Sequence, residues 1–407
     1  MTYKNQNEQK AIERLITAKS ANPLSLNMAA FENILSPRAN LLLSCSHAGR
    51  YVIGHYTDHD FEHSTSKGGL TRENYPDIVL LEKKAASYFK EKLKAAEVDL
   101  RPLSGVHAAI TTISSLTEPG DIVVSIDPLE GGHFATQSLV MQIGRKGLYL
   151  SFDPCACRVN IAKSWEELQI ADMIYIDAGI LRYPINLKEI RAAAPNATIV
   201  YDASHVLGLV TNNVFQSPLT EGADIVQGNT HKSFPGPVKA IIGCSTLETA
   251  DKISNALSKT FISHANTGTL LALCQTVLEM EEYGESYAEQ MINNAQALEK
   301  SLFEYGFDVF REANKNTESH VLLIRNPNAN TIARALIEAG LIVNARNFHE
   351  ESFLRLGTQE ITRRGLKEND MSLISEIFKQ AEEKAPLEIL EKKIHEIASS
   401  HCIIGYC

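Results

Sequence analysis

Short apolar runs alternate with helical patterns between residues 122 and 244. Runs rich in Val and Ile, without a regular polar alternation, are typical of strands buried on both faces of a mainly parallel sheet. Helical spacing lies between several runs, for example at residues 186–194. The pattern therefore predicts an α/β domain built on such a sheet. The predicted strands are residues 122–127, 148–153, 173–178, 197–203, 224–229 and 239–244.

The pattern changes after a long helical stretch at residues 267–304. Shorter strands and helices alternate beyond it, and they predict a smaller C-terminal α+β domain. We place an N-terminal arm with a helix in residues 1–35, the large domain in residues 36–285 and the small domain in residues 286–407. The small domain is expected to contain strands at residues 321–325, 341–346 and 353–358, and helices at residues 329–339, 368–384 and 386–399.

Composition narrows the class of protein. The 407 residues carry a formal net charge of -10, and 44% of them are hydrophobic, which is ordinary for a globular protein. The acidic balance argues against a nucleic-acid partner, which needs a basic surface. No apolar run approaches the about 20 residues that span a bilayer, and the N-terminus lacks the apolar core of a signal peptide. We therefore expect a soluble, cytoplasmic protein without a membrane partner, whose scattered cysteines are reduced thiols.

Polar residues follow several of the predicted strands. Asp127, Asp177 and Asp202 each stand at the end of one strand, and residues 229–231 follow another. Ligands of open parallel sheets bind outside the carboxyl ends of the strands. We therefore expect these residues to lie together at one edge of the sheet, around a small-molecule site.

Lys232 is the most informative residue near that edge. It stands next to His231 and shortly before the Pro-Gly-Pro sequence at residues 235–237. A lysine in a partly dry cleft has a lowered pKa and forms Schiff bases with carbonyl groups. Lys232 is thus a candidate anchor for a pyridoxal-phosphate (PLP) cofactor. The alternative is an ordinary lysine in a surface loop.

Asp202 and Arg355 would supply two charges that such a site needs. A carboxylate at the position of Asp202 would pair with the protonated pyridine nitrogen and keep the ring an electron sink. The alternative for Asp202 is a helix N-cap. Arg355 lies inside an apolar strand, so its guanidinium needs a buried anion, and a substrate carboxylate is a natural bidentate partner. An internal salt bridge is the alternative for Arg355.

Two glycine-containing turns add to this set. Gly131 and Gly132 would let His133 approach a flat ring closely. Ser104 and Gly105 form a turn that enters a predicted helix, where free N–H groups and the helix dipole favour a phosphate.

The order of these motifs resembles the serine hydroxymethyltransferase family of fold-type I PLP-dependent enzymes. The likeness runs from about residue 32 to residue 365, and it favours a divergent member similar to threonine aldolases and transaldolases. The segments that carry it are FENILSPRA (31–39), LSGVHAA (103–109), EGGHFA (130–135), YDASHVLGLV (201–210), NTHKSFPGP (229–237) and LRLGTQEITRRG (354–365).

The resemblance implies a role for each matching residue. Lys232 would form the Schiff base with PLP, Asp202 would pair with the pyridine nitrogen and His133 would stack on the ring. His205 would lie by the ring hydroxyl and the substrate carboxylate. Arg355 would bind that carboxylate.

The same resemblance implies a homodimer with shared active sites. Tyr51 falls where the family has an active-site tyrosine, given by the partner subunit, that contacts the substrate. Glu32 is a further catalytic candidate from the FENILSPRA segment. The remaining cofactor contacts would come from Ser104, Gly105, Asn229, Thr230 and His231.

Several features that the family uses for folate are missing from this chain. The glutamate two residues after the tyrosine is replaced by Ile53, a serine of the first motif by Phe31 and a phosphate-binding serine by Val106. The asparagine-containing loop of the pterin pocket is shortened to ARNFHEES (345–352). The glycine-rich segment that the partner subunit sends to the phosphate reads ISHANTGT (262–269).

These departures shape the expected reaction. Aldol chemistry at the Cα–Cβ bond of an amino acid needs the electron sink but not folate. We therefore expect a β-hydroxy-α-amino-acid aldolase or transaldolase, with an amino-acid substrate and an aldehyde acceptor. A folate-dependent glycine/serine hydroxymethyltransferase stays open, as do decarboxylation, transamination and β-elimination. An inactive scaffold is disfavoured, because a retired site tends to lose its costly buried charges.

One cluster is not explained by the resemblance. His55, His59 and His63 stand four residues apart, with acidic residues between them. On a helix they would share one face and form a weak metal-site candidate. The alternative is a polar loop at the mouth of the site. Since no second cluster matches it, we predict no metal.

Overall fold

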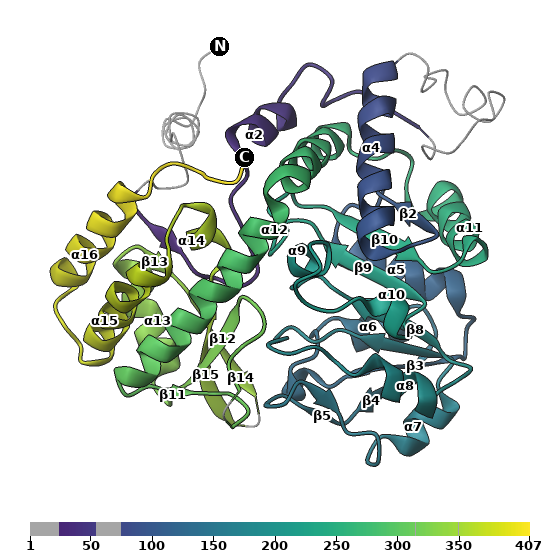
Figure 1. Ribbon diagram of the computed structural model, residues 1–407. Helices are drawn as coiled ribbons and strands as arrows, with labels where there is room; N and C mark the ends of the chain where they lie inside the picture. The colour runs from purple at the N-terminus through teal and green to yellow at the C-terminus, as the bar shows by residue number, and fades with distance from the viewer. Residues whose placement is uncertain (1–23, 54–74, 314, 349) are drawn as a thin grey trace, which may run out of the picture.

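A seven-stranded sheet forms the centre of the larger lobe in the computed structural model, which describes residues 24–53, 75–313, 315–348 and 350–407 (Figure 1). In spatial order its strands are β2 (Glu97–Asp99), β10 (Ala240–Cys244), β9 (Ile225–Asn229), β8 (Thr198–Asp202), β7 (Met173–Ile176), β3 (Ile122–Ile126) and β4 (Lys146–Leu150). From β9 to β4 neighbouring strands run parallel, whereas β10 runs antiparallel to both β9 and β2. The predicted mainly parallel sheet is confirmed.

Helices cover both faces of this sheet, which explains why its strands are continuously apolar. Val123 and Val124 are neighbours on β3 and belong to two different apolar cores, because successive side chains point to opposite faces. One face packs on α5 (Gly105–Leu116), α6 (Thr136–Gln142) and α11 (Leu247–Ala256). The other packs on α4 (Pro76–Leu93), α7 (Trp165–Ile170), α8 (Leu187–Ala193), α9 (Leu207–Val210), α10 (Pro218–Glu221) and α12 (Thr267–Glu304).

The smaller lobe contains a four-stranded antiparallel sheet in the order β11 (Asp308–Val309), β12 (Val321–Arg325), β15 (Glu351–Gly357) and β14 (Asn344–Phe348). The N-terminal arm joins this lobe through β1 (Leu26–Asn27), which pairs in parallel with β13 (Leu341–Ile342). Its helices are α13 (Ala329–Glu338), α14 (Gln359–Arg363), α15 (Met371–Glu382) and α16 (Leu387–Ser400). The remaining elements are α2 (Pro37–Leu43), β5 (Phe152–Asp153), β6 (Arg158–Val159), η2 (Pro128–Glu130), η3 (Leu257–Phe261) and η4 (Glu368–Asp370).

Helix α12 runs between the two lobes (Figure 1). Its first half, with Val277 and Met280, packs into the core of the large lobe, while Leu298 and Leu302 belong to the core of the small lobe. The boundary predicted between residues 285 and 286 therefore falls inside one continuous helix. The three-part division of the chain stays a prediction.

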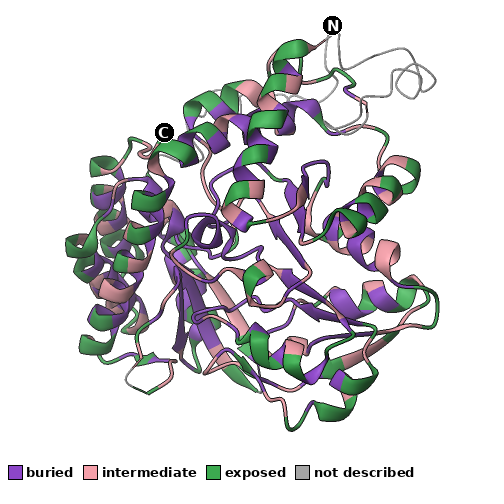
Figure 2. Ribbon diagram, turned by 45° about the vertical axis from the view of Figure 1, so that its right-hand side comes forward, coloured by how far each residue is buried: buried purple, intermediate pink, exposed green. Residues whose placement is uncertain are grey.

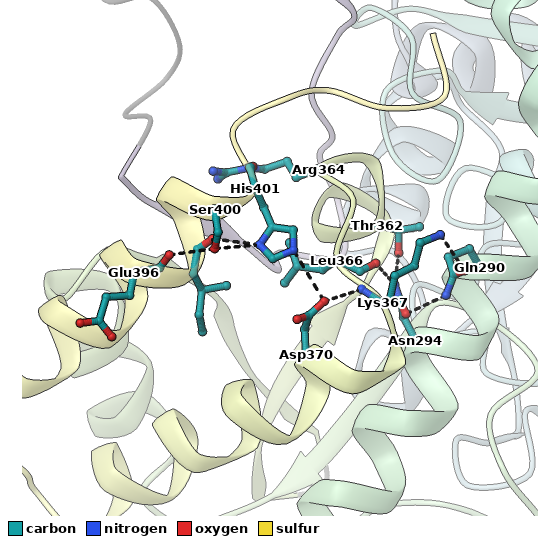
Figure 3. A network of polar contacts seen from close by, with 11 residues as sticks. Gln290, Asn294, Thr362, Arg364, Leu366, Lys367, Asp370, Glu396, Ser400 and His401 are labelled. Atoms are coloured by element: carbon teal, nitrogen blue, oxygen red, sulfur yellow. Dashed lines mark hydrogen bonds and ion pairs between the residues drawn. The ribbon is translucent and has the colours of Figure 1, made fainter.

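Polar contacts fasten the C-terminal helices beside α12 and α14 (Figure 3). Asn294 on α12 donates its amide to the hydroxyl of Thr362 at 2.8 Å and to the carbonyl of Leu366 at 2.9 Å. The Nε of Arg364 donates to the carbonyl of His401 at 2.9 Å. These bonds hold the segment that directly follows β15, and β15 carries Arg355.

Burial follows the layers. Figure 2 shows buried strands at the centre of both lobes and exposed residues on the outer sides of the helices. All seven cysteines are free thiols. In the described ranges no helix is long and apolar enough to cross a membrane.

Candidate active site

A cavity of about 420 Å³ lies at the carboxyl ends of the central strands, where the small lobe faces the large sheet. This is the edge at which ligands of parallel sheets bind. Phe31 from the N-terminal arm and Arg346 from the small lobe close its sides. The residues predicted for the site that line it are Gly105, Gly132, His133, Asp177, Asp202, His205, Asn229, Lys232 and Arg355. Asp127 does not line it, and its carboxylate accepts from the Leu129 N–H at 2.8 Å.

Lys232 is 9% exposed, so it is not a surface-loop lysine. Its Nζ lies 3.0 Å from Nε2 of His205, and its backbone carbonyl accepts a hydrogen bond of 2.7 Å from Asn33. The pKa of Lys232 is lowered to about 8, mainly by burial; the charge of Asp202 opposes this shift and that of Arg355 adds to it. Near neutral pH a useful fraction of the amine is therefore uncharged and nucleophilic.

Asp202 ends β8 and is held by a small polar network. One carboxylate oxygen accepts from the Ser204 backbone N–H at 2.8 Å. The other accepts from the Tyr175 hydroxyl at 3.1 Å and from the Gln227 amide at 3.3 Å. Asp202 is not a helix N-cap, since the next helix is capped by Val206. These hydrogen bonds fix the orientation of the Asp202 carboxylate in the cavity, where it can pair with a cationic ring nitrogen.

His205 is a neutral imidazole whose tautomer follows from its partners. Its Nδ1 lies 3.2 Å from the Ala30 carbonyl, which only accepts, so Nδ1 carries the hydrogen. Its Nε2 is then free to accept from Lys232. Burial and the charges of Lys232 and Arg355 lower the pKa of His205 well below its usual value.

His133 reaches the cavity through a tight glycine turn. Gly131 adopts a φ of 106°, and a Cβ on Gly132 would lie 2.0 Å from the Ile126 carbonyl oxygen, so neither position readily accepts a side chain. The backbone N–H of His133 donates to Asp177 at 3.3 Å. Burial lowers the pKa of the His133 ring, which keeps it neutral.

The N-terminus of α5 lies beside Asn229. Ser104 caps the helix by accepting from the His107 N–H at 3.2 Å, and the Gly105 N–H donates to the Asn229 side chain at 2.8 Å. A Cβ on Gly105 would lie 2.6 Å from the Asn229 amide nitrogen, so this close approach requires glycine. A helix N-terminus of this kind favours a phosphate.

Arg355 is buried on β15 and makes no internal salt bridge within the described part of the chain. Its Nε donates to the Asn344 side chain at 3.0 Å and its Nη1 to the Gly179 carbonyl at 3.1 Å. The ring of Phe31 lies 5.5 Å from its guanidinium carbon. Burial and the charge of Arg346 lower its pKa to about 10. The guanidinium is thus available to an anion from outside the chain.

Other predicted residues lie beside the cavity without lining it. Thr230 is fully buried and donates to the Pro237 carbonyl at 2.7 Å. Burial and Lys232 lower the pKa of the neighbouring His231 to about 4. Glu32 accepts from the Asn27 amide at 3.0 Å. Like Ser104, these residues stay predictions as cofactor or catalytic groups.

Tyr51 does not line the cavity of its own chain. It is 46% exposed, and its ring stacks on His264 with centroids 3.7 Å apart. The candidate metal residues His55, His59 and His63 lie outside the described residues. In the ranges that are described, no group of three His, Cys, Asp or Glu residues could hold a metal ion.

Sequence reasoning did not single out Tyr175 and Arg346, which line the cavity, or Gln227, which contacts Asp202. Tyr175 and Gln227 are polar positions within apolar strands, and each bonds to Asp202. Arg346 is a charge within the predicted strand at residues 341–346. Each of these residues was visible in the sequence as a polar side chain within an apolar run. Only the pairing register of its strand shows on which face of the sheet it lies.

Comparison with known proteins shows which family this chain resembles. The family model of serine hydroxymethyltransferase matches residues 25–378. The serine hydroxymethyltransferase of Methanosphaera stadtmanae is 33% identical over 374 residues, which cover 88% of this chain and 86% of that protein. The fluorothreonine transaldolase of Streptantibioticus cattleyicolor is 32% identical over 368 residues, or 89% of this chain. The chain spans only 58% of the length of that transaldolase.

A solved structure extends the likeness to the whole fold. The crystal structure of L-threonine transaldolase from Pseudomonas fluorescens in its internal aldimine state matches with a TM-score of 0.88 at 25% identity. The match covers 97% of this chain and 93% of that chain.

The groups in the cavity fit PLP. The amine of Lys232 suits its carbonyl, the carboxylate of Asp202 its pyridine nitrogen, and the N-terminus of α5 its phosphate. Because the family model spans most of the chain and the cavity holds the groups that this cofactor needs, the chain belongs to the serine hydroxymethyltransferase family and is a PLP-dependent enzyme.

Proposed function

We propose that the protein is a β-hydroxy-α-amino-acid aldolase or transaldolase that makes and breaks the Cα–Cβ bond of its substrate without folate. The observation that carries the proposal is the wall of the cavity beside Arg355. There the ring of Phe31 packs 5.5 Å from the guanidinium carbon, at a position where the family resemblance places a serine. Two of the similar proteins are transaldolases, which supports the same reaction class.

PLP, when bound, supplies the electron sink for the negative charge that remains at Cα after bond cleavage. The chain's own groups orient the substrate and move protons. Arg355 would bind the α-carboxylate, and its bonds to Asn344 and Gly179 hold the guanidinium in place. Phe31 lines the cavity beside Arg355, and its ring would exclude water from this end.

Two neutral imidazoles serve as proton acceptors in the proposed reaction. The Nε2 of His205 lies 3.0 Å from Lys232 and would hold a proton from the amine while the substrate enters. His133, whose pKa burial also lowers, would accept the proton of the substrate β-hydroxyl. Both rings are unprotonated near neutral pH, which a base requires.

We also propose that two copies of the chain share their active sites. Tyr51 and the 262–269 segment are the parts that the resemblance assigns to the partner subunit. In the structure Tyr51 stacks on His264, and neither residue lines the cavity of its own chain. Because Tyr51 and His264 contact each other outside that cavity, both lie where they could reach the active site of a partner subunit.

The reaction is tested with the PLP-loaded enzyme and L-threonine in buffer without tetrahydrofolate. We expect release of acetaldehyde, measured by coupling to alcohol dehydrogenase and NADH. The Lys232→Ala variant should release none, because it lacks the amine that holds the cofactor. Turnover of serine that strictly requires tetrahydrofolate, with no threonine cleavage, would instead assign a folate-dependent hydroxymethyltransferase.

A further inference from the structure

Two guanidinium groups point into the same cavity. Arg355 comes from β15 and Arg346 from the adjacent strand β14. A Cβ built on Gly179 would lie 3.0 Å from Nη1 of Arg346 and 3.7 Å from Nη1 of Arg355. Both guanidinium groups therefore lie beside Gly179.

The strand register explains why they meet. In the β14–β15 pair Asn344 stands opposite Arg355, and Arg346 stands opposite Phe353. Alternate residues of a strand share a face, so Asn344 and Arg346 both lie on the face of Arg355. Asn344 then accepts from Arg355, while Arg346 reaches forward into the cavity.

The protein partners of Arg346 and Arg355 are neutral acceptors. Arg346 donates to the Gly132 carbonyl at 2.8 Å, and Arg355 donates to Asn344 and to the Gly179 carbonyl. In the described part of the chain, the ion pairs involve neither arginine. Burial lowers the pKa of both guanidinium groups, and the charge of Arg346 also lowers the pKa of Arg355. Two partly dehydrated cations of this kind are costly without an anion between them.

Asp177 is the cavity carboxyl that acts on Arg346, but it does not neutralise both cations. Its oxygens accept from the Ile126 N–H, the His133 N–H and the Thr136 hydroxyl. Burial raises the pKa of Asp177 to about 7, so near neutral pH the group is only partly ionised. Asp202, the other carboxyl that lines the cavity, bonds to Ser204, Tyr175 and Gln227. Within the described residues neither carboxyl is hydrogen-bonded to Arg346 or Arg355, so an anion from outside the chain has two cations to bind.

We infer that the enzyme acts on a β-hydroxy-α-amino acid whose side chain carries a second carboxylate. Arg355 holds the α-carboxylate, and Arg346 holds the second one. The inference rests on the proposed function, and in that reaction the aldehyde is itself a carboxylic acid. In the synthetic direction the Cα of glycine loses a proton and bonds to the aldehyde carbon, while the aldehyde oxygen gains a proton. No oxidant or reductant takes part.

The experiment compares matched acceptor aldehydes with the PLP-loaded enzyme and glycine as donor. The pairs are glyoxylate with acetaldehyde and 4-oxobutanoate with butanal, which share a carbon skeleton but differ in the carboxylate. We expect the wild type to have a higher kcat/KM for the acid of at least one pair. Arg346→Gln should lower kcat/KM for that acid by about 10- to 100-fold, the range for a lost charge-assisted hydrogen bond, and lower it far less for the neutral aldehyde.

Two further variants sharpen the comparison. Arg346→Lys keeps the charge and should retain part of the preference for the acid. Arg325→Gln is the matched control, because Arg325 lies on the same sheet but pairs with Asp308 and Glu351 outside the cavity. This control should leave both aldehydes unaffected. Equal losses for acid and neutral aldehydes in Arg346→Gln would overturn the inference, because they would mean that Arg346 only positions the Gly132 turn.

A second readout separates this inference from the reaction itself. L-Aspartate and L-alanine are titrated into the PLP-loaded enzyme, and binding is followed by the absorbance of the cofactor. Tighter binding of aspartate in the wild type, lost in Arg346→Gln, supports the second carboxylate site even if no aldehyde is turned over. Absence of any preference for the acidic ligand in both assays rejects it.

Discussion

At the scale of single residues, the site depends on groups that burial keeps uncharged. Lys232 and His205 lie 3.0 Å apart, and burial lowers the pKa of both. A charged pair would repel at this distance, whereas a neutral imidazole accepts a hydrogen bond from the amine. The contact therefore favours a lysine that is ready to react with a carbonyl group.

The pKa of Lys232 gives a prediction on pH. Because it is lowered to about 8, the ammonium form dominates below that pH, and the reactive neutral fraction falls about tenfold with each pH unit. The rate at which the apoenzyme captures PLP, followed by stopped-flow absorbance, should rise with pH up to about 8 and level off above it. Arg355→Gln removes a positive charge that lowers this pKa, so its inflection should move to higher pH. An inflection near the ordinary lysine value of about 10.4 would contradict the account.

The site could be predicted at this scale wherever a residue's chemistry stood out from its surroundings. Lys232, Asp202 and Arg355 were visible as charges at the ends of, or inside, apolar runs, and the structure brings them to one cavity. Gln227 and Arg346 were not selected, because their importance depends on which strand lies opposite and which face each side chain occupies.

At the scale of elements, the sequence pattern predicted most strands of the large sheet, because burial on both faces leaves a local signature. The exceptions in both sheets depend on which segment each strand pairs with. The strand expected at residues 341–346 forms two strands, since Leu341 pairs with Leu26 in the N-terminal arm and Asn344 pairs with Arg355. The run at residues 148–153 also divides, as Phe152 leaves the sheet to pair with Val159. A local apolar pattern does not show with which segment a strand pairs, whether that segment is near or far along the chain.

Helix α5 shows how one element prepares a binding site from local chemistry. The Ser-Gly turn was visible in the sequence, and the structure places the Ser104 hydroxyl as its N-cap. The contact of Gly105 with Asn229 was not predictable, because Asn229 ends a strand of the sheet that lies far along the chain. The helix N-terminus and the strand end meet only in the folded structure.

At the scale of the whole molecule, the cavity requires both lobes. The large lobe provides Lys232 and Asp202, and the small sheet provides Arg346 and Arg355. Phe31 belongs to the N-terminal arm. The long helix α12 packs into both cores and ties the lobes together. Substrate binding and cofactor chemistry therefore depend on the position of the small lobe relative to the large lobe.

The proposed sharing of sites between subunits predicts complementation. Lys232→Ala and Tyr51→Phe are each expected to have low activity. If Tyr51 serves the partner's cavity, a mixed dimer of the two variants holds one site with both residues intact. Random exchange of subunits should then restore about a quarter of the wild-type activity, as expected for a two-fold dimer. A mixture no more active than the average of the separate variants would show that Tyr51 does not act across an interface.

The central claim is folate-independent transfer of a glycyl unit between aldehydes, and an isotope experiment tests it most directly. The PLP-loaded enzyme is incubated with L-threonine labelled with carbon-13 at Cα, together with a second aldehyde and no tetrahydrofolate. The products are then observed by NMR. The account predicts that the label appears in a new β-hydroxy-α-amino acid built on the second aldehyde, and that Lys232→Ala forms none. Transfer of the label only into serine, and only after tetrahydrofolate is added, would contradict it.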